Sequence, residues 1–229
     1  MSELLSIGIL PLALTLIAFQ VGLWCQKKVR SPLCNPILIA VVIVLIFMAL
    51  TGMDNGTYQA GTAKLSWLMT PATISLAIPM YEQLSILKKN LKAIALGIAV
   101  GAVSCLVMVL LFSLAVGFDR ELTISLLPKS VTSAIGVPLS ELSGGISAIT
   151  TPAIILTGIV AGSMGTPLCK LFHLTDPVAQ GVALGTSGHV IGTSKANELG
   201  ELTGAVSSLS LVVAGLLTSV LLPFVVELL

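Results

Sequence analysis

Charged side chains are scarce in this sequence of 229 residues, which has 11 Lys or Arg and 10 Asp or Glu, 9% of the chain. A soluble domain carries about 25% charged residues. So few charges cannot cover a soluble core, and 55% of the residues are hydrophobic, with a mean hydropathy of +1.07. The composition excludes a soluble globular protein, a disordered chain and a nucleic-acid binder. It predicts a membrane protein with several spans.

Aromatic residues make up only 4% of the chain, which argues against a β-barrel with aromatic girdles. Cys25, Cys34, Cys105 and Cys169 show no metal-ligand spacing, so we read all four as free thiols and expect no metal site and no cofactor. The first residues carry no basic cluster. We therefore expect the first apolar run to remain as a helix instead of being cleaved as a signal peptide.

Long apolar runs predict helices that cross the membrane, because a spanning helix needs about 20 apolar residues. Five runs without charge come near that length: 4–24, 36–53, 93–118, 146–169 and 202–226. Three further apolar segments are interrupted by Pro or Gly: 65–81, 122–140 and 177–194. We predict an all-α polytopic membrane protein, one transmembrane domain over 1–229 with about eight membrane segments, three of them broken or re-entrant.

Basic residues cluster at 27–30 and at 88–92, and both clusters are expected on the cytoplasmic side. An even number of crossings must separate them, so segment 65–81 is predicted to cross and the N-terminus to be external. The charges of the second half do not decide whether 122–140 and 177–194 cross or re-enter.

A repeat of about 57 residues relates the interrupted segments. Residues 71–79 (PATISLAIP) align with 128–136 (PKSVTSAIG) at this offset, and Gly101, Gly158 and Gly215 are also 57 residues apart. The repeating unit is an interrupted element followed by a long helix. Repeats built around broken helices are typical of secondary transporters, whose binding site lies near the middle of the membrane.

Lys129 is the most unusual charged residue, because it follows Pro128 inside an apolar stretch. A lysine inside the membrane is costly and is by default a functional candidate. We predict that a half-helix begins near Lys129. The free N–H groups at the start of this half-helix, together with the charge of the lysine, suit a small anion such as a carboxylate. The neighbouring hydroxyls are further donors: Ser130, Thr132 and Ser133. The alternative is a lysine that extends to the membrane interface.

The densest polar stretch is 185–195 (GTSGHVIGTSK). It is predicted to line the same site with Thr186, Ser187, His189, Gly192, Thr193 and Lys195. His189 could carry a proton with the substrate, or it could be a structural histidine satisfied by one backbone carbonyl. Asn35 either caps the helix that begins at Pro36 or belongs to the site. The stretch imitates the Gly-x-Ser-Gly of intramembrane serine proteases, but His189 is too close to Ser187 to face it on a helix. We predict no catalytic residue and no enzyme.

Four stretches carry a resemblance to a known family: 35–40 (NPILIA), 71–83, 127–132 (LPKSVT) and 185–198 (GTSGHVIGTSKANE). The chain resembles the LrgB/CidB family over nearly its whole length. Where the family often has Ser-His and Arg, this chain has Gly188-His189 and Lys195.

The resemblance implies a multi-pass protein of the bacterial plasma membrane, often acting with a small LrgA/CidA-type membrane partner, and a homo-oligomer such as a dimer. It implies carriage of small monocarboxylates such as pyruvate, glycolate or glycerate, since the plastidial glycolate/glycerate translocator has an LrgB-like part. The rival expectation is a holin/antiholin-like pore or a regulator of murein hydrolases and autolysis. The expected partners are the lipid bilayer and a small carboxylate, and no nucleic acid.

Overall fold

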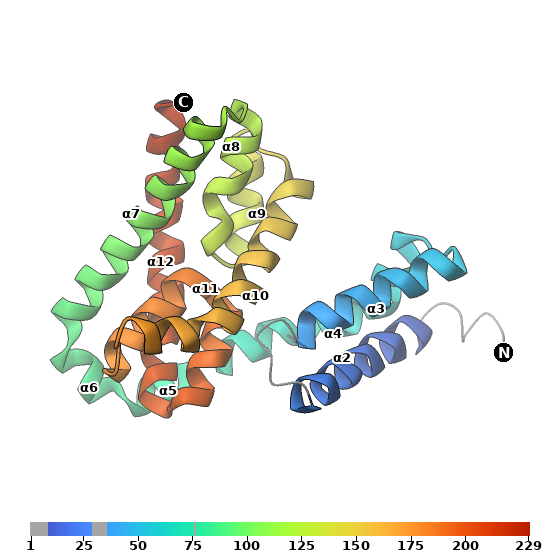
Figure 1. Cartoon of the computed structure of the whole chain (residues 1–229), viewed down its shortest axis with the longest axis horizontal. Helices are drawn as coiled ribbons and strands as arrows, with labels where there is room; N and C mark the ends of the chain where they lie inside the picture. The colour runs from blue at the N-terminus through green and yellow to red at the C-terminus, as the bar shows by residue number, and fades with distance from the viewer. Residues whose placement is uncertain (1–8, 29–35, 76) are drawn as a thin grey trace. The chain divides into compact units, whose positions relative to one another are not determined.

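The computed structural model describes residues 9–28, 36–75 and 77–229, and these residues form helices and no strand. The bounds are α2 (Leu10–Lys28), α3 (Pro36–Thr51), α4 (Asn55–Ser75), α5 (Ala77–Glu82), α6 (Leu84–Lys89), α7 (Leu91–Val116), α8 (Arg120–Leu126), the short 3₁₀ helix η2 (Leu127–Ser130), α9 (Ser133–Leu142), α10 (Ser147–Leu171), α11 (Pro177–Leu199) and α12 (Glu201–Glu227) (Figure 1). The predicted all-α class is confirmed.

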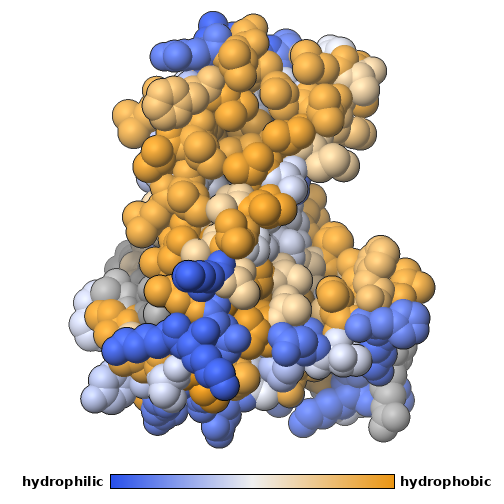
Figure 2. Space-filling view, turned by 90° about the vertical axis from the view of Figure 1, so that its left-hand side faces the viewer, coloured by the Kyte–Doolittle hydropathy of each residue, from blue (hydrophilic) through white to orange (hydrophobic). Residues whose placement is uncertain are grey.

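Among the described helices, α2, α7, α10 and α12 are long and apolar enough to cross a membrane, and α3 is a shorter apolar helix. The sequence predicted all five. One face of the molecule is largely apolar (Figure 2), and long aliphatic side chains of α7 and α12 such as Leu96, Val100, Leu216 and Val220 are exposed. Such a surface is stable in lipid and not in water. The protein is a membrane-embedded helical protein.

The chain divides into two compact units, 1–75 and 76–229. In the first unit, α2 packs along α3 and α4. A Cβ atom on Gly22 would lie 2.5 Å from the carbonyl oxygen of Pro36, so glycine allows α2 and α3 to approach closely. Asp54 caps α4 by accepting hydrogen bonds from the backbone N–H and the hydroxyl of Thr57, and these bonds lower the pKa of its carboxyl.

The second unit is built around α7 and α12, which run parallel. Ile94 and Ile98 near the start of α7 pack against Val206 near the start of α12. At the other end, the turn from α7 to α8 lies beside the C-terminus (Figure 1), where the Arg120 guanidinium donates to the carbonyl of Val226 at 3.4 Å. The lysine-rich helix α6 lies next to the start of α7, at what we call the lysine end of this unit.

Segment 122–140 does not cross this unit. The chain descends through α8 and η2, reverses at Val131 and Thr132, and returns through α9. The reversal brings Ser125 back to Ile146, whose N–H donates to the Ser125 hydroxyl at 2.7 Å. We call residues 120–142 hairpin A. It opens at the end opposite the lysine end.

Segment 177–194 also reverses, because α11 consists of two helical arms that meet at a sharp kink at His189. His189 has φ +40° and ψ −132°, outside helical values. Residues eight apart in a straight helix are separated by about 12 Å, yet a Cβ atom on Gly192 would overlap the carbonyl oxygen of Leu184. The two ends of α11 both approach the start of α12, Gly181 at Thr203 and Asn197 at Gly204. We call α11 hairpin B, and it opens at the lysine end.

The 57-residue repeat therefore has a structural counterpart: each hairpin is followed by a long helix, A by α10 and B by α12. Asp119 and Asp176, 57 residues apart, cap the two hairpins in the same way, accepting from the N–H of Leu122 at 2.8 Å and of Ala179 at 2.9 Å. The sequence analysis gave neither aspartate a role, although Asp176 directly before Pro177 is a common helix-start signal. The repeats are inverted, because the hairpins open at opposite ends.

Candidate functional site

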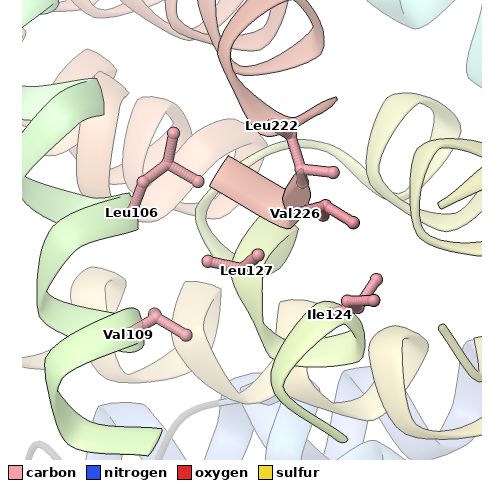
Figure 3. Packing of buried hydrophobic residues seen from close by; sticks show 6 residues of the cluster. All are labelled: Leu106, Val109, Ile124, Leu127, Leu222 and Val226. Atoms are coloured by element: carbon pink, nitrogen blue, oxygen red, sulfur yellow. The ribbon is translucent and has the colours of Figure 1, made fainter. Parts of the chain in front are cut away.

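The tips of the two hairpins meet inside the second unit. The η2 turn, which carries Lys129, contacts α7, α10, α11 and α12. Leu127, the first residue of this turn, is buried between two helices (Figure 3). Leu106 and Val109 of α7 lie on one side of it, and Leu222 and Val226 of α12 lie on the other. Close packing of this kind drives helix association in lipid, where no hydrophobic effect acts between helices. It fixes the turn that presents Lys129.

The half-helix begins later than predicted. Pro128 lies in the 3₁₀ turn with φ −84° and ψ 16°, and α9 starts at Ser133 after Thr132 in extended conformation. A 3₁₀ turn tolerates Pro128 near its start, where the missing N–H has no helical partner. The prediction of a helix start near Lys129 was wrong by four residues. Ser133 therefore lies in the first turn of α9, and Lys129 precedes the break.

Lys129 is half-buried, and its ammonium donates to the Ser130 hydroxyl at 3.3 Å. Within the described part of the chain, the ion pair that forms joins Lys195 to Glu198 at 2.6 Å, and no carboxylate pairs with Lys129. The η2 turn contacts α7, α10, α11 and α12, so Lys129 lies among the helices of the second unit. An ammonium without a counter-charge at this depth is costly unless an anion joins it.

His189 forms the tip of hairpin B. Its side chain is 5% exposed, and its Nε2 lies 3.0 Å from the carbonyl oxygen of Ile154 in α10. Since a carbonyl only accepts, Nε2 carries the hydrogen of this bond. Gly158 makes room for the ring: a Cβ atom there would lie 2.6 Å from Cε1 and from Nε2. The sequence marked Gly158 only as a position of the repeat, and it gave no signal for the role of Ile154.

The other predicted residues of hairpin B divide into two groups. Thr186 and Ser187, next to the tip, donate to their own helix at Val182 (2.7 Å) and Ala183 (2.6 Å), so their lone pairs remain available as acceptors. Gly192, Thr193 and Lys195 lie on the returning arm. Gly192 faces the first arm, and Thr193 shares a hydrogen bond of 2.9 Å with Ser207 of α12.

Lys195 forms an ion pair with Glu198 at 2.6 Å. Asn35 and Cys34 lie outside the described residues, and Cys25, Cys105 and Cys169 are free thiols. No group of His, Cys, Asp and Glu among the described residues could hold a metal ion. The η2 turn that carries Lys129 contacts α11, which carries His189 at its tip, while Gly192, Thr193 and Lys195 make contacts within the fold.

The LrgB-like family model matches residues 15–228. The chain belongs to the LrgB-like family. No solved structure matches it. The match covers both compact units and both hairpins, so the resemblance noted in four stretches of the sequence extends to the whole protein. Membership shows a membrane protein of the LrgB/CidB type and leaves its substrate and mode of action to be argued from the site.

Proposed function

We propose that this LrgB-like protein is a secondary carrier of small monocarboxylates such as pyruvate or glycolate and glycerate, located in the bacterial plasma membrane. The observation that carries the proposal is the half-buried Lys129 at the tip of hairpin A, whose ammonium has a neutral hydroxyl and, among the described residues, no carboxylate as its partner. A small anion between the tips would supply the missing charge. Opposed broken helices near mid-membrane are the arrangement in which secondary transporters bind substrates.

The charge of the tips favours a monocarboxylate over a dicarboxylate. Lys129 contributes one positive charge, and His189 is held by a neutral carbonyl at 3.0 Å. Ser133 lies in the first turn of α9, where the positive end of the helix dipole adds a partial charge. One carboxylate balances this arrangement, while a second would be buried without a partner at considerable cost.

His189 is the proposed proton-coupling residue. Because Nε2 donates to Ile154, a proton arrives at Nδ1, and the bond to Ile154 persists in both charge states. Co-transport of a proton with the anion would then be visible as proton flux. In His189→Asn we expect monocarboxylate-dependent proton flux, followed with a pH-sensitive dye inside proteoliposomes, to fall by at least tenfold. Equal proton flux in wild type and this variant would remove His189 from coupling.

Uptake of labelled pyruvate and glycolate into proteoliposomes tests the carrier itself. We expect saturable uptake that is lost in Lys129→Ala, partly retained in Lys129→Arg, and unchanged in Lys170→Ala, which removes an exposed lysine of α10. Amount and thermal stability of each variant in detergent control for folding. Flux that does not saturate and admits unrelated solutes would support the holin/antiholin-like pore instead.

The same assay tests the proposed assembly. We propose a homo-oligomer, with a dimer as the simplest case, and a small LrgA/CidA-type partner in the membrane. Saturable uptake by the purified protein alone places the transport activity in this chain. Uptake that appears only after the partner is reconstituted with it places the activity in the complex.

A further inference from the structure

The lysine end of the second unit carries a basic surface that the neighbouring carboxylates do not neutralise. Lys88 and Lys89 end α6, Lys92 lies at the start of α7, and all three side chains are exposed. Glu82 is the one acidic residue in the sequence from 77 to 92. Within the described part of the chain, no carboxylate forms an ion pair with any of the three lysines. We call these three lysines the lysine cluster.

The fold holds the lysine cluster on an ordered helical segment. Leu87, next to the first lysine, is 4% exposed and belongs to the same hydrophobic core cluster as Ile94 and Ile98 of α7. Asn90 fastens the bend between α6 and α7, since its side-chain amide donates to the carbonyl of Ile86 at 3.0 Å. The three ammonium groups are therefore kept close to one another at the start of α7.

Helix stability accounts for only part of the lysine cluster. Positive charges are favourable in the last turn of a helix, which suits Lys88 and Lys89 in α6. Lys92 lies in the first turn of α7, where a positive charge opposes the helix dipole. An anion bound beside the cluster would offset both this unfavourable term and the repulsion among three neighbouring ammonium groups.

Exposed aliphatic side chains lie beside the lysine cluster. They are Leu84 and Ile86 of α6 and Leu91 of α7, and further along α7 the apolar surface continues with Leu96 and Val100. Figure 2 shows such an apolar face with hydrophilic side chains gathered at one end of it. A phospholipid has the same order of chemistry, with a charged headgroup above apolar chains. A soluble anion would use the ammonium groups and leave the aliphatic side chains uncovered.

We infer that the lysine cluster binds the headgroup of an anionic phospholipid in the cytoplasmic leaflet, with the acyl chains along the exposed face of α7. The lysine end faces the cytoplasm by the distribution of basic residues. Each lysine near an anionic membrane surface strengthens binding about fivefold. The inference goes beyond the proposed carrier and does not depend on it, because lipid binding can be measured without any transported substrate.

Thermal unfolding of the purified full-length protein in detergent tests the inference, because a ligand that binds the folded state raises the unfolding temperature. We expect phosphatidylglycerol to raise the Tm more than an equal amount of phosphatidylcholine does. We expect added NaCl to reduce this difference, since the lysines are exposed and their charges are screened by salt.

Two triple variants identify the lysines responsible. In K88Q/K89Q/K92Q the phosphatidylglycerol concentration that gives half of the Tm shift should rise by about 100-fold. The matched control K27Q/K64Q/K170Q also removes three exposed lysines, all outside α6 and α7, and should keep the wild-type value. K88R/K89R/K92R, which retains the charges, should keep it as well.

Equal Tm shifts with phosphatidylglycerol and phosphatidylcholine would overturn the inference, and so would equal half-maximal concentrations in the two glutamine variants. An equal shift with inorganic phosphate would assign the lysine cluster to a soluble anion instead. A wild-type protein that does not respond to phosphatidylglycerol would leave the cluster to an acidic segment of another protein. Loss of carboxylate uptake bears on the carrier alone and leaves these measurements unchanged.

Discussion

The imidazole of His189 occupies the space that Gly158 leaves open on α10, with Cε1 and Nε2 each 2.6 Å from where a Cβ atom of residue 158 would stand. The same ring donates to the carbonyl of Ile154, one turn earlier on α10. A residue in an unfavourable backbone conformation, at a cost of about 1–3 kcal/mol, is thus held by a helix that has a glycine where the ring needs it.

Gly158→Ala should displace the His189 ring. We expect a loss of about 1–3 kcal/mol of stability, the usual cost of overpacking, and reduced saturable uptake. Gly215→Ala is the matched control from the next repeat: its Cβ atom would meet Cδ1 of Ile135 at 2.8 Å, the flexible end of that side chain. Thermal unfolding of both variants in the same detergent makes the comparison. An equal loss of stability in the two variants would show that the His189 ring does not require a glycine at position 158.

The two helix caps should contribute similarly to the free energy of unfolding, since Asp119 and Asp176 cap the first helices of equivalent hairpins. Each Asp→Ala change removes an acceptor for a helix N–H and should cost about 0.5–2 kcal/mol. Glu141→Ala is the control, because Glu141 is exposed and its side chain makes no hydrogen bond or ion pair with the described residues. Melting temperatures of the three variants check this. A cap variant as stable as the Glu141 variant would contradict the assigned role.

The re-entrant topology predicts which residues are accessible from the same side of the membrane. Single cysteines at Glu121 and Leu142 flank hairpin A and should react with an impermeant maleimide from one side. Cysteines at Phe172 and Glu201 flank hairpin B and should react from the other side, which the lysine end identifies as cytoplasmic. If hairpin A crossed the membrane, Glu121 and Leu142 would label from opposite sides.

One side-chain hydrogen bond joins the returning arm of each hairpin to the helix that follows it. Ser140 bonds Thr150 at 2.7 Å, and Thr193 bonds Ser207, the repeat mate of Thr150, at 2.9 Å. Double-mutant cycles with Ser→Ala and Thr→Val should give coupling energies of about 0.6 kcal/mol for each pair, the average for such bonds in membrane proteins. Coupling indistinguishable from zero in either cycle would assign that arm to packing alone.

Much of the architecture was predictable because apolar length and charge are local properties. A run of about 20 residues without charge has few options in a membrane, where a helix satisfies its own backbone, so α7, α10 and α12 followed from residue order. The offset of 57 residues marked Gly158 and Gly215 as equivalent before any contact was known. Lys129 was identified because a charge inside an apolar stretch is costly wherever the chain folds.

The tertiary structure decided whether each broken helix crosses or turns back, and which residues contact each other. A broken helix can continue across the membrane or turn back, and the choice depends on packing against residues far away in sequence, such as Gly188 on Ala161 or Gly181 on Thr203. The sequence determined which segments enter the membrane, because transfer from water to lipid is a sum over neighbouring residues. Only the folded chain decided that His189 is held by Ile154 and that Lys129 meets no carboxylate in the part of the chain that the structure describes, because contacts between distant residues have no local signature.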